Sequence, residues 1–228
     1  MDLAIVIFLL GGLFLGWSLG SNDAANVFGT AVGTRMVRFK TAAIVCSLFI
    51  ILGAVISGSG TTETLGKLGA INALPGAFAA CVAAGLSVYI MTKFGLPVST
   101  TQAIVGAIVG WNLYTGSSTN IKVLLTILST WILCPIIAAL IAMLFFILTK
   151  KLLKNTTWHI LRLDAYTRTA LLIAGAFGAY SLGANNIANV MGVFVPIAPF
   201  ADIQLGSFLT FSSKEQLFLL GGIAIAVG

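Results

Sequence analysis

Charged residues are scarce in this sequence. They make up 8% of its 228 residues, whereas a soluble domain carries roughly 25%. Hydrophobic residues make up 59%, and the mean hydropathy is +1.08. Because lipid tolerates no unpaired backbone groups, long apolar runs predict helices. We therefore expect an all-α integral membrane protein, a polytopic helical bundle that crosses the cell membrane several times. The net charge of +6 then bears on topology, and no nucleic-acid partner is expected.

Cysteine and histidine are also few, with three Cys and one His. Cys46, Cys81 and Cys134 lie in apolar runs without paired spacing, which argues against a disulfide framework or a metal site. The sequence contains no nucleophile with an adjacent base and no phosphate-binding loop of the Walker type. It therefore predicts a protein that is not an enzyme and has no resident cofactor.

A ten-residue stretch rich in small and amide residues occurs twice. Residues 18–27, Ser-Leu-Gly-Ser-Asn-Asp-Ala-Ala-Asn-Val, match residues 181–190 at seven of ten positions. Two unrelated helix-packing faces would explain the small residues but not the two Asn of each copy. Such a repeat in a hydrophobic chain is typical of transporters built from two related halves. Asp23 adds a carboxylate at membrane depth, which costs roughly 3 kcal/mol or more and indicates a functional site.

The apolar runs divide the chain into seven helical segments. We expect them at residues 3–34 with a break at Gly20–Asp23, 41–56, 73–92, 97–111, 121–148 with a kink at Pro135, 169 onward with a break at 183–186, and 217–228. Segment 97–111 is short enough to re-enter the membrane rather than span it. We assign residues 1–149 to a first repeat, 150–168 to a basic amphipathic linker and 169–228 to the start of a second repeat.

The basic residues divide unevenly between the two sides if every segment crosses once. Nine lie on one side, and Lys67, Lys122 and Lys214 lie on the other. Since cytoplasmic loops are enriched in Lys and Arg, the N-terminus is expected outside. Five crossings separate the two copies of the motif, so the repeat should be inverted. The nine residues are Arg35, Arg38, Lys40, Lys93, Lys150, Lys151, Lys154, Arg162 and Arg168.

A second polar element, Gly-Leu-Pro-Val-Ser-Thr-Thr-Gln at residues 95–102, precedes another apolar run. Pro97 suits the first turn of a helix, where the following N–H groups have no intrahelical acceptor. The positive end of the helix dipole and the hydroxyls of Ser99, Thr100 and Thr101 would form an anion site at membrane depth. Simple capping of the helix start is the alternative explanation.

The repeated motif offers oxygen ligands of the kind that hard cations prefer. Asp23 supplies a carboxylate, and Asn22 and Asn26 supply amide oxygens. These groups suit Na⁺, or a proton carried on Asp23 itself. The second copy supplies similar groups without the charge, on Asn185, Asn186 and Asn189.

Together these elements resemble the inorganic phosphate transporter (PiT) family, whose signature Gly-Ala-Asn-Asp-Val-Ala-Asn-Ala occurs once in each half. It stands here at residues 20–27 and 183–190, and the family's Pro-Val-Ser-Thr-Thr element stands at 97–101. The resemblance implies a secondary transporter that moves inorganic phosphate with a cation, usually Na⁺ and in some relatives H⁺. It assigns phosphate binding to Ser99, Thr100, Thr101 and Gln102, and Na⁺ binding to Asn22, Asp23, Asn26, Asn185, Asn186 and Asn189.

Two departures from the family pattern are visible. Asn186 stands where the signature often has Asp, and no second Pro-Val-Ser-Thr-Thr element occurs in the 228 residues. We therefore expect a portion of a longer polypeptide, whose site needs the remainder of the second repeat or a homo-oligomeric partner. A sulfate carrier, a proton-coupled phosphate carrier, an anion channel and a phosphate-sensing receptor are the alternative functions.

Overall fold

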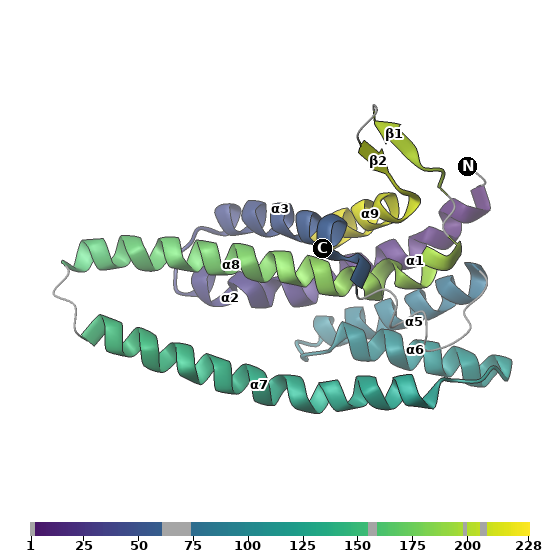
Figure 1. Ribbon diagram of the computed structural model, residues 1–228, viewed down its shortest axis with the longest axis horizontal. Helices are drawn as coiled ribbons and strands as arrows, with labels where there is room; N and C mark the ends of the chain where they lie inside the picture. Colours follow the sequence, from purple (N-terminus) through teal and green to yellow (C-terminus); the bar gives the residue numbers. More distant parts are fainter. Residues whose placement is uncertain (1–2, 61–73, 155–158, 198–199, 206–208) are drawn as a thin grey trace.

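The computed structural model describes residues 3–60, 74–154, 159–197, 200–205 and 209–228, and most of these residues are helical. Five of the described helical stretches are long and apolar enough to cross a membrane. Figure 1 shows them side by side along one long axis. The prediction of a polytopic helical membrane protein is confirmed.

The elements follow the predicted segments closely, with one addition. The predicted first repeat and the start of the predicted linker contain α1 (Leu3–Leu19), a π-helical turn η1 (Gly20–Ala24), α2 (Ala25–Gly33), α3 (Phe39–Ser57), α5 (Leu74–Lys93), α6 (Thr100–Thr115) and α7 (Ile121–Lys154). The remainder contains α8 (Ile160–Met191), a 3₁₀ turn η2 (Gly192–Ile197), strands β1 (Ile203–Leu205) and β2 (Leu209–Phe211), and α9 (Ser213–Val227). The two strands pair antiparallel into a hairpin that projects from the bundle, which the hydropathy pattern did not predict (Figure 1).

Both predicted helix breaks were wrong, in different ways. At Gly20–Asp23 the chain stays helical but changes to π winding, so α1, η1 and α2 form one continuous stretch. At residues 183–186 the winding does not change, and α8 is α-helical from Ile160 to Met191. Both predictions relied on glycine and amide residues. Glycine can instead serve close helix packing, and it then remains helical in a membrane.

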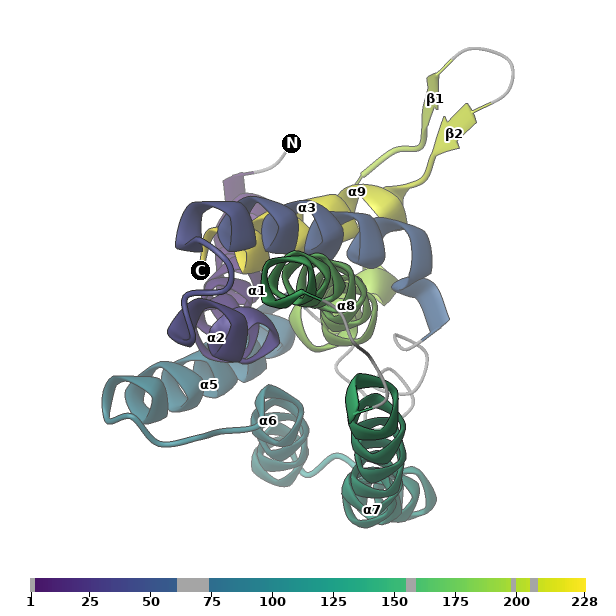
Figure 2. The same ribbon diagram turned by 90° about the vertical axis from the view of Figure 1, so that its left-hand side faces the viewer.

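The predicted linker at residues 150–168 is largely helical where the structure describes it. α7 continues to Lys154 and α8 begins at Ile160. Val123, Leu124 and Trp131, near the start of α7, pack against the core, whereas the rest of α7 lies apart from the other helices (Figures 1 and 2). Pro135 lies inside α7 without ending it, and Ile127 is its one buried residue. An apolar helix exposed in this way suits a lipid environment.

The helices that carry the two motif copies run in opposite directions. α1 and α2 run from right to left in Figure 1, and α8 returns from left to right. α5 runs from right to left and α6 runs back to the right, so the chain is again at the right-hand end of the bundle when α7 begins. The opposite directions of α1–α2 and α8 therefore hold whether or not α5 and α6 each cross the whole membrane. The 16 residues of α6 measure about 24 Å, less than the ~30 Å hydrocarbon core. An inverted repeat requires this opposite course, although the complete repeat stays a prediction.

Glycines allow the helices that carry the two motif copies to cross their neighbours closely and in matching ways. α1 packs on α9, and α3 packs on α8. At four glycines, an added Cβ would collide with a backbone carbonyl group of the facing segment. The four approaches are Gly20 to Ile225, Gly183 to Ile50, Gly53 to Tyr180 and Gly228 to Trp17. The first approach corresponds to the second, and the third to the fourth. In each pair, one of the two contacting residues shifts by 163 positions (Gly20 to Gly183, Trp17 to Tyr180) and the other by 175 (Ile50 to Ile225, Gly53 to Gly228).

Candidate functional site

The predicted anion-binding element forms the N-terminus of α6. Ser99 is extended, with φ −94° and ψ 115°, and its Oγ accepts a hydrogen bond from the Gln102 N–H at 3.3 Å. α6 therefore begins at Thr100, and Pro97, predicted to lie in the first helical turn, stands outside the helix. Capping of the helix start is one role of Ser99. The next two hydroxyls, on Thr100 and Thr101, bond to the repeated motif instead.

The first motif copy reaches this helix terminus from η1. Asn22 Nδ2 donates to Asp23 Oδ1 at 2.8 Å and to the Val98 carbonyl oxygen at 2.9 Å. Thr100 Oγ1 donates to Asp23 Oδ2 at 3.3 Å. One carboxylate oxygen is therefore bonded to the neighbouring amide, and the other is bonded to a hydroxyl of α6.

Two groups in this network were not predicted. Thr92, near the end of α5, donates from Oγ1 to Asn22 Oδ1 at 3.3 Å. This bond orients the Asn22 amide so that Nδ2 faces Asp23 and Val98. A single threonine at a helix end carries no distinctive sequence signal. The Val98 carbonyl carries no sequence signal either, although the backbone groups next to a helix start often form hydrogen bonds with groups outside that helix.

The second motif copy reaches the same terminus from α8. Asn189, only 3% exposed, donates from Nδ2 to Thr101 Oγ1 at 2.8 Å and to Asn186 Oδ1 at 2.9 Å. Asn186 Nδ2 in turn donates to the Leu182 carbonyl oxygen at 3.2 Å. The two motif copies thus bond to adjacent hydroxyls on the first turn of one helix.

Three predicted site residues contribute less. Asn26 is exposed, and its Nδ2 lies 3.5 Å from the Asn22 carbonyl oxygen. Asn185 is exposed on α8, whereas its neighbour Asn186 joins the network. The Gln102 side chain is exposed, and this residue takes part through its backbone N–H.

The network joins one negative charge to the N-terminus of α6. Asp23 is the one ionisable side chain among the residues just described, and its partners are hydroxyl and amide groups. Carboxylate and amide oxygens suit a hard cation, and hydroxyls with N-terminal N–H groups suit an oxyanion. The arrangement can therefore hold both ions close together.

A cavity of about 570 Å³ lies on a different face of η1, between η1, α2, α3 and the end of α9. None of the side chains that form the hydrogen bonds above lines it. Ala24 and Ala43 line it, and their counterparts in the second repeat are Ile187 and Phe218. Those two side chains lie against Gly58, in the turn that ends α3. The cavity is therefore distinct from the polar site.

Comparisons with known proteins identify the family of this chain. Residues 19–228 match the sequence profile of the phosphate transporter family. "Putative phosphate permease TK2061" of Thermococcus kodakarensis is 38% identical over 166 residues, which are 68% of this chain and 41% of the relative. "Inorganic phosphate transporter 2-1, chloroplastic" of Arabidopsis thaliana is 31% identical over 150 residues, 60% of this chain and 25% of the relative. This chain thus spans at most about two fifths of either relative.

A solved structure, "The sodium-dependent phosphate transporter", has a similar fold. Its TM-score to this chain is 0.75, and the similarity covers 99% of this chain and 74% of the other. The sequences are 24% identical, so the likeness supports the arrangement of the helices.

Proposed function

Because the chain belongs to the phosphate transporter family, as its motifs predicted, we propose that it carries inorganic phosphate across the membrane coupled to a cation, with Na⁺ expected. The observation that carries this proposal is the meeting of both motif copies at the N-terminus of α6, through the Asp23–Thr100 and Asn189–Thr101 hydrogen bonds. Sodium dependence is part of the name of the structural relative.

In this proposal phosphate binds at the first turn of α6. The hydroxyls of Ser99, Thr100 and Thr101 and the N-terminal N–H groups supply donors. The helix terminus contributes roughly half a positive charge. That is too little for an anion carrying one to two negative charges beside the Asp23 carboxylate. A cation is therefore needed to make the combined charge acceptable at membrane depth.

The cation in this proposal is held by the repeated motif. Asp23 supplies the charged oxygen ligand and Asn22 an amide oxygen, with Asn26 in the same copy. The second copy offers Asn186 and Asn189, with Asn185 on the adjacent surface, and it lacks a carboxylate. We therefore expect the cation to bind more tightly at the first copy than at the second.

We also propose that the N-terminus faces outside. The ends of α2 and α7 and the start of α8 lie toward the left end in Figure 1, and α5 runs toward that side and ends near the middle. These segments and their turns carry the nine basic residues, whereas Lys122 and Lys214 begin helices elsewhere. Lys67, the third residue assigned to the opposite side, lies outside the described residues. The positive-inside rule makes the left end cytoplasmic.

Uptake of labelled phosphate into proteoliposomes tests the proposal. An inward Na⁺ gradient is compared with an equal K⁺ gradient and with an inward proton gradient. Accumulation that follows Na⁺ supports a sodium-coupled carrier, and accumulation that follows protons would make Asp23 the proton carrier. Labelled sulfate in the same assay tests selectivity between the two oxyanions.

Two outcomes would overturn the proposal. Phosphate that equilibrates without regard to either gradient would indicate an anion channel. Phosphate that binds but does not cross would indicate a receptor.

A further inference from the structure

We propose that the Thr100 hydroxyl is the element that couples the two ions, because it can donate its single proton either to Asp23 or to bound phosphate. This inference rests on the proposed function and concerns how the site is regulated. Thr100 Oγ1 donates to Asp23 Oδ2 at 3.3 Å. An ionised carboxylate can only accept, so the proton of this hydroxyl is committed to Asp23.

The neighbouring hydroxyl is bonded in the opposite sense. Thr101 Oγ1 accepts from Asn189 Nδ2 at 2.8 Å, and Asn189 is held in that orientation by its second bond to Asn186 Oδ1. Thr101 therefore keeps its own proton for another acceptor. The two adjacent threonines thus differ, because the motif accepts the hydroxyl proton of Thr100 but not that of Thr101.

Because Thr100 is buried, its hydroxyl has few hydrogen-bond acceptors other than Asp23 and a bound phosphate. Its exposed fraction is 1%, so bulk water is a poor substitute acceptor. A cation bound at the Asp23 carboxylate takes up oxygen lone pairs and weakens that group as an acceptor. The hydroxyl then rotates toward the terminus of α6, where a phosphate oxygen satisfies it. No covalent bond changes and no proton is transferred.

The same competition works in both directions. Without a cation, phosphate must displace the hydrogen bond from Thr100 to a charged group, which costs about tenfold or more in affinity. Once phosphate holds the hydroxyl, both Asp23 oxygens can turn to the cation. Thermodynamic linkage requires these two effects to be equal.

The test is phosphate affinity measured by titration with labelled phosphate, at saturating Na⁺ and with choline in its place. The ratio of the two dissociation constants is the coupling factor. In Thr100→Val the coupling factor should fall about tenfold, leaving only the direct attraction between the ions, and Thr100→Ser should restore it. In Thr101→Val phosphate should bind more weakly in both conditions, with the coupling factor unchanged. Thr126→Val on α7, whose hydroxyl bonds to the Lys122 carbonyl, is the matched control.

The outcomes separate this inference from the proposed function. A wild-type protein whose phosphate affinity ignores Na⁺ and protons would overturn the proposed function. A wild-type protein that is coupled, together with a Thr100→Val variant whose coupling factor stays within about twofold, would overturn the inference alone. If Thr100→Val does not fold, Thr100→Ala takes its place with the same expectation. A Thr101→Val variant that loses coupling as Thr100→Val does would also contradict the inference.

Discussion

The two copies of the repeated motif have nearly the same sequence, yet they use different residues at the site. In the first copy Asn22 and Asp23 bond to the α6 region, and Asn26 is exposed. In the second, Asn189, the counterpart of Asn26, is buried and bonds to Thr101. Asn185, the counterpart of Asn22, is exposed on α8.

The winding of the helix explains this difference. η1 is π-helical, whereas the same positions in α8 are α-helical. A π turn inserts extra chain into a helix and rotates the residues that follow it relative to those before. It turns Asn22 and Asp23 toward α6 and Asn26 away. π turns are frequently found at functional sites, and here the π turn coincides with the copy that carries the carboxylate.

The strongest test of this asymmetry is Asp23→Asn, which makes the first copy as neutral as the second. We expect cation-coupled phosphate uptake to fall by about a hundredfold or more, because the charged cation ligand is lost. The measurement is labelled uptake under a Na⁺ gradient, at matched amounts of reconstituted protein. Asp164→Asn, a change of the same kind on the exposed start of α8, should leave uptake unchanged. Coupled uptake that survives in Asp23→Asn would show that the carboxylate is structural.

The reciprocal crossing of the repeats can be broken at equivalent glycines. Gly20→Ala and Gly183→Ala each place a Cβ against a backbone carbonyl of the opposite repeat, and overpacking of this kind costs about 1–3 kcal/mol. The expected result is a similar loss in the free energy of unfolding in detergent for both variants. Gly29→Ala in α2 is the control, since an added Cβ there meets nothing within 4 Å. It should raise stability by about 0.5–1 kcal/mol. Unequal losses at the first two positions would contradict the reciprocity.

A third variant, Asn186→Asp, restores the missing charge to the second copy. The new carboxylate would lie one hydrogen bond from Asn189 and two from Thr101, near the proposed phosphate. We expect phosphate affinity at low Na⁺ to fall about tenfold through repulsion, and its dependence on Na⁺ to become steeper. Titration with labelled phosphate over a range of Na⁺ concentrations measures both effects. Asn185→Asp, at the adjacent exposed position, should change them little because solvent screens its charge. An unchanged affinity in Asn186→Asp would separate Asn186 from the phosphate site.

Much of the fold and the site could be predicted because the determining signals are local. Apolar runs located most membrane helices to within a few residues, although α8 begins at Ile160 rather than at Thr169, and the hydroxyl residues after Pro97 located the start of α6. The convergence of the two motif copies on that terminus was not predicted from the sequence. The hydrogen bonds from Thr100 to Asp23 and from Asn189 to Thr101 show it, while the roles in ion binding stay predictions.

The errors arose where packing decides between two local structures. Gly20 and Gly183 indicated helix breaks, yet both serve the close crossing of the repeats, and the facing helix cannot be identified from local sequence. The two copies differ at Ser21, Asp23 and Ala24 and have different neighbours, and only the first contains a π turn. Thr92 was missed because its role depends on α5 ending beside Asn22, which is a property of the tertiary structure.

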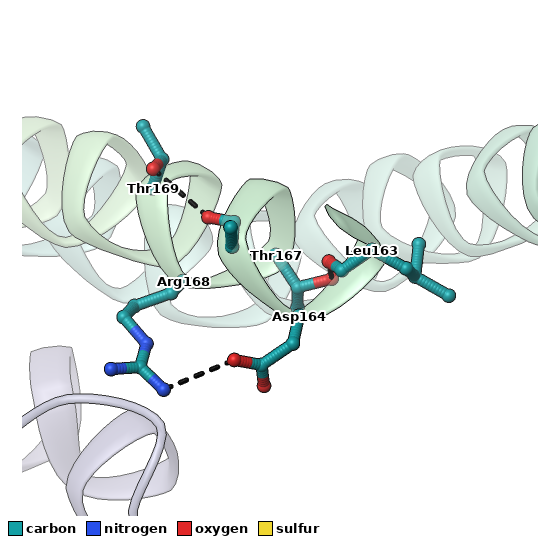
Figure 3. A network of polar contacts seen from close by, with 6 residues as sticks. Leu163, Asp164, Thr167, Arg168 and Thr169 are labelled. Atoms are coloured by element: carbon teal, nitrogen blue, oxygen red, sulfur yellow. Dashed lines mark hydrogen bonds and ion pairs between the residues drawn. The ribbon is translucent and has the colours of Figure 1, made fainter. Parts of the chain in front are cut away.

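The smallest expected effect is at the start of α8, at the other end of the helix from the motif. It tests whether the motif acts independently of the rest of its helix. Figure 3 shows Arg168 bonded to Asp164 at 3.1 Å, beside hydroxyl bonds that Thr167 and Thr169 make within the same helix. The two side chains are 53% and 46% exposed, and an exposed pair four residues apart contributes about 0.3–0.5 kcal/mol.

Arg168→Gln should therefore lower the free energy of unfolding by no more than this amount, with the loss disappearing in high salt. Phosphate affinity and its Na⁺ dependence should stay at wild-type values, because the motif lies several helical turns away. A double-mutant cycle with Asp164→Asn isolates the energy of the pair. A loss several times larger, retained when Asp164 is already neutral, would mean that Arg168 acts on another group. An anionic lipid headgroup at the adjacent membrane surface would then be the first to test, in bilayers with and without anionic lipid.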